Sequence, residues 1–320
     1  MCVMRAIMYH YVRPVPEELP FFRYLHVDDF ARQIDWLMQN HRLVSRDELF
    51  AARETGTVPE GIVLTFDDGL SDHFDYVFPI LKSRGLFGLF YICTSPYVTC
   101  KVLDVHRIHL LLGCLGGQEA LNRLSRHLKD EMIFHGDLQA FREATYKHQT
   151  NDSATTLFKR TLNYLISYEF RENVIDALFD EAFGNQRELV ESFYLTPDQI
   201  REMDREGMVI GSHGVNHYVF SKLPVETQRQ EIFESFAFLE GLVGRPMTTF
   251  CHPYGGPHTY TRDTEALLEE VGSVVSFAVD PRDITAADFR ESPHALPRYD
   301  CNMFPHGKAS FGPDRPRQAA

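Results

Sequence analysis

The chain lacks any long apolar stretch. Its longest run of mostly apolar residues, 85–93, falls well short of the roughly 18 to 20 consecutive apolar residues of a membrane-spanning helix. Residues 1–10 also lack the charged segment followed by an apolar core that marks a secretory signal. We therefore predict no membrane insertion and expect a cytoplasmic protein.

Basic residues and closely paired cysteines are scarce as well. The 32 Lys and Arg residues are outnumbered by 45 Asp and Glu residues, and the net charge of -13 argues against nucleic acid or an anionic membrane as a partner. The six cysteines show neither metal-binding spacing nor the density of a disulfide framework, so we expect free thiols. With 320 residues, of which 44% are hydrophobic, the chain is long enough for one large domain.

Two adjacent aspartates follow a short apolar run. The run 61–64 reads as a buried strand, and the sequence Thr-Phe-Asp-Asp-Gly at 65–69 places Asp67 and Asp68 at its end. Neighbouring carboxylates repel each other and lose hydration unless a positive group compensates. A metal ion would compensate and would let one carboxylate act as a ligand and the other as a base. The alternative is an acidic turn that caps the following helix.

Two histidines, His213 and His217, follow a second predicted strand at 208–212. Their spacing places both imidazoles on one side of a helical turn, as in helical zinc sites. Neutral imidazole suits zinc, and one carboxylate completes a three-ligand set with open positions for water and substrate. Two ordinary surface histidines are the alternative. Because both motifs follow predicted strands, and parallel sheets build sites at the carboxyl ends of their strands, we favour a metal site.

A third motif, Phe-Cys-His-Pro-Tyr-Gly-Gly at 250–256, follows another predicted strand approach. A Pro-Tyr-Gly-Gly turn holds the backbone rigidly and can aim an amide N–H outward, as a tetrahedral oxyanion requires. Taken alone, this motif is weak and is more typical of an ordinary loop. Because it comes third in order after the two other motifs, it supports a common site formed by all three.

The order of these motifs resembles that of polysaccharide deacetylases of the NodB-homology type, carbohydrate esterase family 4. The resemblance covers residues 59–95 and 196–300 and implies a distorted (β/α) barrel. It also implies that Asp67 is the general base, that Asp68, His213 and His217 bind the metal, and that the backbone N–H of Tyr254 donates to the oxyanion. The metal would be zinc, with cobalt, nickel and manganese as alternatives.

The chain departs from the family pattern at two positions. Gly214 stands where Ser or Thr normally follows the first histidine, and that hydroxyl supports the turn without binding the metal. Cys251 stands where the family often has an Arg, two residues before the Pro-Tyr pair, and that Arg bears on the orientation of the catalytic base. The predicted metal ligands are unaffected by either departure.

The general acid that protonates the leaving amine has two candidates. His10 lies in the opening Met-Tyr-His-Tyr at 8–11, directly after a plausible first strand, and His294 precedes the Leu-Pro-Arg segment that ends at Arg298. Some deacetylases of exported and precursor sugars resemble this chain in both segments. We rank His10 as the catalytic candidate, against a purely structural role beside its neighbouring tyrosines, and predict that His252, His294 and Arg298 bind substrate.

The coarse pattern is α/β, because apolar strand-like runs alternate with helical patterns. We predict a single deacetylase domain over residues 1–310, interrupted at about 101–195 by a mostly helical insertion that packs over the barrel mouth and shapes the substrate pocket, and a disordered tail at 311–320. In the segment 225–243, apolar residues recur at helical spacing and mark a face that packs on the core.

The sequence therefore predicts a metal-dependent N-deacetylase that hydrolyses an acetamido group on a sugar. Without export signals we expect a nucleotide- or lipid-linked precursor of surface-glycan synthesis as the acetylated amino-sugar substrate. One alternative is a metal-dependent amidase or deformylase that acts on another small amide, because metal and base recognise the carbonyl and not the sugar. The other is a non-catalytic carbohydrate-binding protein, in which a ligand or Asp67 would be lost; none is lost here.

Overall fold

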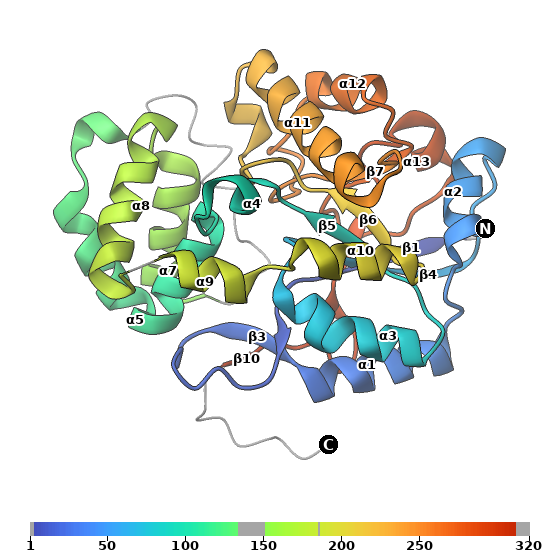
Figure 1. Cartoon of the computed structure of the whole chain (residues 1–320), viewed down its shortest axis with the longest axis horizontal. Helices are drawn as coiled ribbons and strands as arrows, with labels where there is room; N and C mark the ends of the chain where they lie inside the picture. Colours follow the sequence, from blue (N-terminus) through green and yellow to red (C-terminus); the bar gives the residue numbers. More distant parts are fainter. Residues whose placement is uncertain (1–2, 134–150, 185, 312–320) are drawn as a thin grey trace. The chain divides into compact units, whose positions relative to one another are not determined.

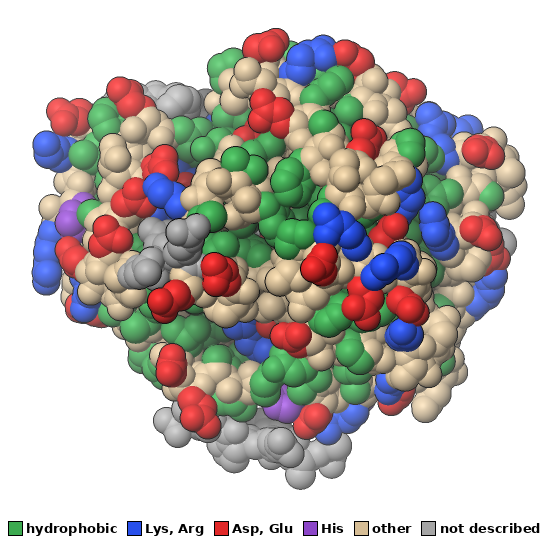
Figure 2. Space-filling view, in the orientation of Figure 1, with side chains coloured by type: hydrophobic (Ala, Val, Ile, Leu, Met, Phe, Trp, Pro, Cys, Tyr) green, Lys and Arg blue, Asp and Glu red, His purple; other side chains and the backbone are tan. Residues whose placement is uncertain are grey.

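The computed structural model describes residues 3–133, 151–184 and 186–311 (Figure 1). They form two compact units, of which the first contains residues 3–14, 24–99 and 191–309 and the second contains residues 15–23, 100–133, 151–184, 186–190 and 310–311. The predicted disordered tail lies, from residue 312 on, outside the described residues. Figure 2 shows acidic side chains interspersed with Lys and Arg over the face in view.

The first unit is built on a parallel sheet with the strand order β8-β7-β6-β5-β4-β1-β9. Its strands are β1 (Met4–Tyr9), β4 (Gly61–Phe66), β5 (Leu89–Ile92), β6 (Val209–Ser212), β7 (Thr249–Cys251), β8 (Val275–Phe277) and β9 (Arg298–Asp300). The short strands β2 (Val12–Arg13) and β3 (Arg23–His26) pair with each other in parallel.

The two edges of this sheet meet. Leu296, which precedes β9, donates its N–H to Ser276 of β8, and its carbonyl accepts the N–H of Ala278, at 2.8 Å each. A parallel bridge between Phe277 and Leu296 is the result. The sheet therefore forms a nearly closed barrel of parallel strands with helices around it, and the predicted barrel of the deacetylase type is confirmed.

Alternation along the strands divides the core into two layers. In β4, Ile62, Leu64 and Phe66 belong to the larger apolar cluster, which includes side chains of the surrounding helices, whereas Val63 belongs to a second cluster. The second cluster also holds alternate residues of the other strands, such as Tyr91 and Cys251, so it fills the inside of the curved sheet. Successive strand residues therefore point either into the barrel or toward the helices.

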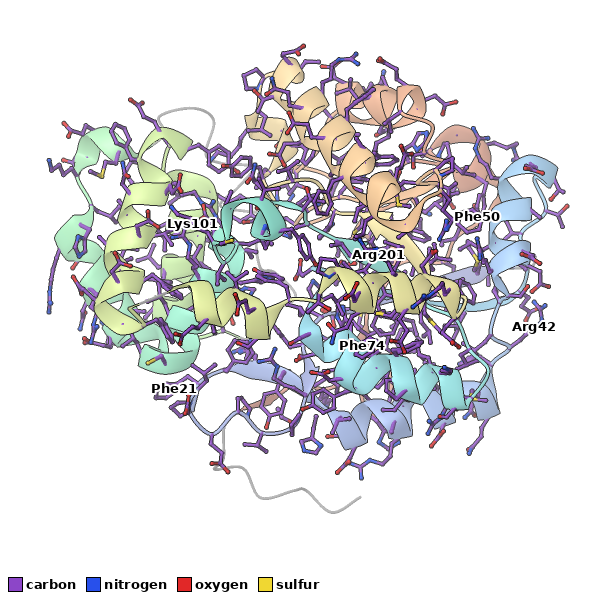
Figure 3. All side chains as sticks on the ribbon, viewed as in Figure 1. Phe21, Arg42, Phe50, Phe74, Lys101 and Arg201 are labelled. Atoms are coloured by element: carbon purple, nitrogen blue, oxygen red, sulfur yellow. The ribbon has the colours of Figure 1, made fainter. Side chains whose placement is uncertain are left out.

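Helices connect the strands of the first unit. They are α1 (Val27–Asn40), α2 (Arg46–Thr55), η1 (His73–Val77), α3 (Phe78–Ser83), α4 (Ser95–Thr99), α10 (Pro197–Arg205), η4 (Phe220–Lys222), α11 (Val225–Val243), α12 (Arg262–Glu270), α13 (Ala286–Glu291) and η5 (Cys301–Met303). Figure 3 labels Phe74 of η1 and Phe50 of α2, which pack against the larger and the second cluster respectively. The predicted core face of 225–243 is found in α11, where Ile232, Phe236 and Leu239 are buried.

The second unit is helical. It contains α5 (Asp104–His127), η2 (Asp130–Met132), α7 (Ser153–Arg160), η3 (Thr161–Leu165) and α8 (Tyr168–Ala182), followed by α9 (Gln186–Phe193), which runs into the first unit, and by β10 (Ser310–Phe311). Helix α5 packs against α7 and α8. Asp104 of α5 pairs with the buried guanidinium groups of Arg107 and Arg171, which ties α5 to α8. Among the described residues, no helix combines the length and hydrophobicity needed to cross a lipid bilayer.

Candidate metal and catalytic site

The first two site residues lie at the end of β4. The N–H of Asp67 donates to the carbonyl of Tyr9 at 3.0 Å, which extends the pairing of β4 with β1 by one residue. Asp67 therefore follows Val63 and Thr65 in the alternation, and its side chain points into the barrel. Asp68 has a φ of 82°, so the chain leaves the strand at this residue and the two adjacent carboxylates contact different partners.

Asp68 meets the two histidines of the second motif. His213 directly follows β6, and its Nε2 lies 3.5 Å from Oδ1 of Asp68, while Nε2 of His217 lies 3.4 Å from the same oxygen. All three side chains are buried. The two imidazole rings stand edge to face, with ring centroids 4.8 Å apart. The strand ends of β4 and β6 thus bring the two sequence motifs together, although they are far apart in the chain.

A hydrogen bond fixes the orientation of His213. Its Nδ1 lies 2.6 Å from the carbonyl oxygen of Cys251. A carbonyl oxygen can only accept, so Nδ1 carries the proton and Nε2 presents its lone pair toward Asp68. Burial lowers the pKa of His213, which favours the neutral imidazole. Support of a metal-binding histidine through its second ring nitrogen is usual in metal sites.

These three residues fit a divalent metal ion. One carboxylate oxygen and two imidazole nitrogens lie within 4.8 Å of one another, and this donor set is typical of zinc and similar transition metals. Asp67, His213 and Cys251 form a second group with the same maximum separation. There, however, the guanidinium of Arg298 donates to both Asp67 and Cys251, and its positive charge opposes a cation. The structure therefore favours Asp68, His213 and His217.

Arg298 of β9 holds the second carboxylate. Its Nη1 and Nη2 donate to the two carboxylate oxygens of Asp67 at 2.8 Å each, a two-pronged arrangement that fixes the carboxylate plane. Nη1 also donates to Oγ1 of Thr65, and Nη2 lies 2.9 Å from Sγ of Cys251. Burial raises the pKa of Asp67, but the charge of Arg298 and the neighbouring histidines outweigh burial and lower the pKa to about 2.

This geometry corrects the predicted substrate contact of Arg298. Its side chain is 1% exposed inside the barrel, where it is fully engaged by protein groups. It instead supplies a positive charge beside Asp67, in a chain where Cys251 occupies the position at which the resembled family often has an Arg. The sequence marked Arg298 as a residue of interest, but its partner, 231 positions away, was not predicted.

His10 follows β1 and faces the same carboxylate. Its Nε2 lies 3.8 Å from Oδ2 of Asp67, and its side chain is 38% exposed, so the ring reaches both the site and solvent. The backbone carbonyl of His10 accepts a hydrogen bond from Nε2 of the buried His73 at 3.1 Å. The predicted placement of His10 beside the site is thus found, and its catalytic role stays a prediction.

Tyr254 lies beside the metal-site histidines. Its ring centroid is 4.8 Å from that of His217. The backbone of Tyr254 has a φ of 61°, and that of Gly255 has a φ of 68°, so the Pro-Tyr-Gly-Gly turn is tight and left-handed. A Cβ at Gly255 would come within 2.4 Å of Val279, which explains the glycine at this position. The turn is therefore held rigidly next to the site, as an oxyanion donor requires.

The other two predicted substrate residues point away from the site. His252 directly follows Cys251, so the two side chains point to opposite sides of the strand. The ring of His252 packs on that of Tyr260, with centroids 4.1 Å apart, and burial lowers the pKa of His252 to about 3. Its Nε2 donates to the carbonyl of His294. The ring nitrogens of His294 contact Ser276 and Glu269. Both histidines therefore support the outer layer, which corrects their predicted contact with substrate and removes His294 as the acid candidate.

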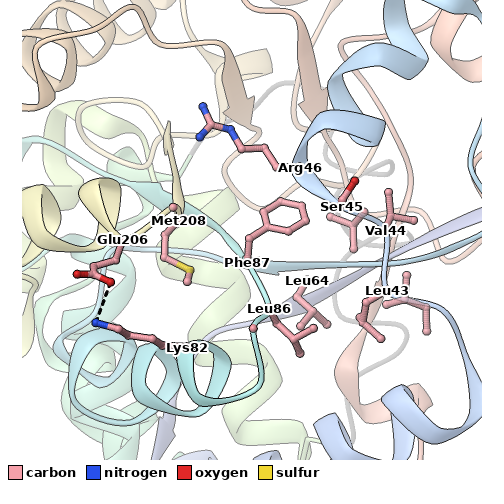
Figure 4. Close-up of a pocket in the computed structure, with 14 residues that line it drawn as sticks. Leu43, Val44, Ser45, Arg46, Leu64, Lys82, Leu86, Phe87, Glu206 and Met208 are labelled. Atoms are coloured by element: carbon pink, nitrogen blue, oxygen red, sulfur yellow. Dashed lines mark ion pairs between the residues drawn. The ribbon is translucent and has the colours of Figure 1, made fainter.

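A pocket of about 440 Å³ lies near the amino ends of β5 and β6, at the opposite end of the strands from these site residues (Figure 4). It is lined by apolar residues that precede β5 and β6 or belong to β4, such as Leu64, Phe87 and Met208, and Lys82 and Glu206 form an ion pair at it. The site residues described above instead follow the carboxyl ends of the strands. Parallel α/β proteins carry their chemistry at that end, so we place the candidate active site there.

Comparisons with known proteins agree with this placement. Residues 143–275 match the family model of polysaccharide deacetylases, a segment that includes the second and third motifs. No curated protein matches the chain. Over this segment, which is less than half of the chain, the protein is similar to polysaccharide deacetylases.

Solved structures share the fold. The deacetylase PplD of Streptococcus pyogenes, solved with acetate, is 16% identical and has a TM-score of 0.59, with 95% of this chain and 96% of that chain covered. IcaB of Ammonifex degensii is 18% identical, with a TM-score of 0.53 and coverages of 93% and 91%. A de-N-acetylase of Aggregatibacter actinomycetemcomitans is 15% identical, with a TM-score of 0.54 and coverages of 92% and 94%.

Proposed function

We propose that the protein is a metal-dependent N-deacetylase that removes the acetyl group from an acetylated amino sugar. The observation that carries this proposal is the pairing of two carboxylates with different environments at one strand end. Asp68 lies with two imidazoles in a metal-type donor set, while Asp67 is held as an ionised carboxylate by Arg298. One carboxylate that binds a metal and one that accepts a proton are the two requirements of metal-assisted amide hydrolysis.

We assign each residue of the site a separate role in the reaction. A divalent ion held by Asp68, His213 and His217 would supply Lewis-acid chemistry and lower the pKa of water. Asp67 accepts a proton from the water whose oxygen bonds to the acyl carbon. The N–H of Tyr254 donates to the oxygen that gains negative charge.

His10 completes the proposed reaction. It protonates the amide nitrogen as the C–N bond breaks, which leaves acetate and a free amine. Its ring lies 3.8 Å from Asp67 and is 38% exposed, so it is accessible to a substrate.

Two neighbours support the substrate class. The deacetylase PplD was solved in complex with acetate, which is the acid released when an N-acetyl group is hydrolysed. The protein of Aggregatibacter actinomycetemcomitans is a de-N-acetylase. We further propose that the acetamido sugar belongs to a nucleotide- or lipid-linked precursor in surface-glycan synthesis. The predicted cytoplasmic location and the predicted position of the helical insertion over the barrel opening remain predictions.

Product analysis tests this proposal. The purified full chain is incubated with zinc or cobalt and a panel of acetylated oligosaccharides, sugar nucleotides, lipid-linked sugars and simple acylamides, and products are followed by mass spectrometry and an acetate assay. We expect loss of the acetyl group from at least one sugar and no loss with Asp67→Asn. Hydrolysis of simple amides alone would favour the amidase alternative. Sugar binding without any hydrolysis would favour a non-catalytic protein.

A further inference from the structure

The loop between the two metal-site histidines contains Gly214, Val215 and Asn216 and forms no helix or strand. Its backbone φ is 80° at Gly214 and 57° at His217, so the loop turns sharply on both sides. Such a loop has no regular hydrogen-bond ladder of its own, and its buried N–H groups need acceptors from elsewhere. Ser212 supplies one, because its Oγ accepts the N–H of Gly214 at 3.1 Å.

The carboxylate of Glu231 supplies the others. Glu231 lies on α11, and its Oε2 accepts the N–H groups of Val215 at 2.9 Å and Asn216 at 2.8 Å, while Oε1 accepts Nδ2 of Asn216 at 2.6 Å. The side chain is buried, and within the described part of the chain it forms no ion pair. Three loop donors thus satisfy the buried carboxyl group of Glu231, and a buried acceptor that lost these donors would be left unsatisfied.

The opposite side of the loop is held as well. The carbonyl oxygens of Gly214 and Val215 accept the N–H groups of Thr94 and Ser95, which follow β5, at 3.2 Å and 3.0 Å. The loop is therefore fixed between the end of β5 and helix α11. Glu231 accepts three of these hydrogen bonds through one side chain, so a single substitution changes all three.

The glycine of this loop fits the same arrangement. A Cβ added at Gly214 would lie 3.4 Å from Oε2 of Glu231, in a backbone conformation that favours glycine. The resembled family normally has Ser or Thr at this position, with a hydroxyl that supports the turn. In this chain, a carboxylate from a neighbouring helix provides that support to the residues that follow.

We propose that Glu231 is a positioning residue for the metal site, because it fixes the loop that sets the separation and orientation of His213 and His217. This inference rests on the proposed metal-dependent function. The hydrogen bonds of Glu231 go to Val215 and Asn216, which lie between the two ligands, so its effect acts through the backbone on either side. Substitutions of the groups that orient metal ligands typically cost about 10- to 100-fold in metal affinity.

Metal affinity is the direct test. Zinc dissociation constants of the wild type, Glu231→Gln and Glu234→Gln are measured by competition with a chromogenic chelator. Glu234 is the matched control, because it is exposed on the same helix and its substitution removes the same charge. We expect the constant of Glu231→Gln to rise by about 10- to 100-fold and that of Glu234→Gln to stay unchanged.

The visible spectrum of cobalt provides a readout of ligand geometry that does not depend on activity. We expect the cobalt bands of Glu231→Gln to be shifted or weakened relative to those of Glu234→Gln, with unchanged far-UV circular dichroism. Equal zinc affinity and equal cobalt spectra in the three proteins would overturn the role of Glu231 and leave the metal site intact. Absence of metal binding in the wild type would instead overturn the proposed metal site.

A second variant covers a failure of Glu231→Gln to fold. Asn216→Ala removes the bond to Oε1 and keeps the backbone donors on Oε2. We expect a smaller weakening of zinc affinity in the same direction. Wild-type affinity in a folded Asn216→Ala, together with an unfolded Glu231→Gln, would show that Glu231 serves stability alone and would overturn the proposal.

Discussion

Replacement of Arg298 by methionine tests the central pair of the site. Methionine keeps most of the side-chain length but removes the charge and all donors. The guanidinium contacts both oxygens of Asp67, the hydroxyl of Thr65 and the thiol of Cys251, and both charged partners are buried. Its loss leaves the carboxylate of Asp67 buried without its compensating charge.

The expected loss in the free energy of unfolding follows from the burial of this ion pair. Removal of one partner of a buried ion pair typically destabilises a protein by about 3 to 5 kcal/mol, because the other charge stays buried and uncompensated. The control is Arg5→Met, since Arg5 pairs with Asp283 at 2.8 Å in the same sheet but both side chains are about one-third exposed. Exposed pairs contribute about 0 to 1 kcal/mol, so Arg5→Met should change the free energy of unfolding much less.

A double-mutant cycle isolates the interaction. Unfolding by urea is followed by circular dichroism for Arg298→Met, Asp67→Asn and the double variant. Asparagine removes the buried negative charge, so the double variant should be more stable than the sum of the single effects predicts, by about 2 to 3 kcal/mol. If the effects are additive, or if Arg298→Met costs no more than Arg5→Met, then Arg298 does not hold Asp67 as we describe.

Four further outcomes are expected from the site. His213→Ala should lose both bound metal and hydrolysis, measured by elemental analysis and acetate release, and retention of the full metal complement would exclude His213 as a ligand. Asp67→Asn should keep its metal and lose activity by about 10²- to 10⁴-fold, the usual effect of removing a general base; near wild-type rates would contradict its role. His10→Gln should lower kcat with the metal retained, and an unchanged kcat would assign His10 a structural role. Treatment of the wild type with a chelator should abolish hydrolysis and zinc should restore it, whereas activity that survives metal removal would refute metal dependence.

Strong local patterns made much of the fold predictable. The apolar run 61–64 was predicted as a strand and lies in β4, and the periodic segment 225–243 is α11 with the same limits. The strand is apolar and the helix is long and periodic, so local conformational preference and the burial of apolar side chains favour the same element in each case. Strand β9 was not predicted, because it has three residues and follows a proline, so its pairing with β1 depends on the whole barrel.

The sequence by itself also selected the residues that form the candidate site. Residue type and strand-end position were sufficient to select Asp67, Asp68, His213 and His217, since parallel strands bring their carboxyl ends to one edge. Gly255 was likewise part of a predicted tight turn, and its φ of 68° agrees. These inferences depend on local sequence and on the direction of the strands, both of which a single sequence contains.

Only the tertiary structure decided which partners the side chains of the site contact. Arg298 became the partner of Asp67 because closure of the barrel brings β9 beside β1, and His252 turned outward because alternation gave the inner position to Cys251. Glu231 reaches the histidine loop only because α11 packs against β6. The contacts of Arg298 and Glu231 join elements that are brought together only by the packing of the barrel, so their energy appears only once the barrel has formed.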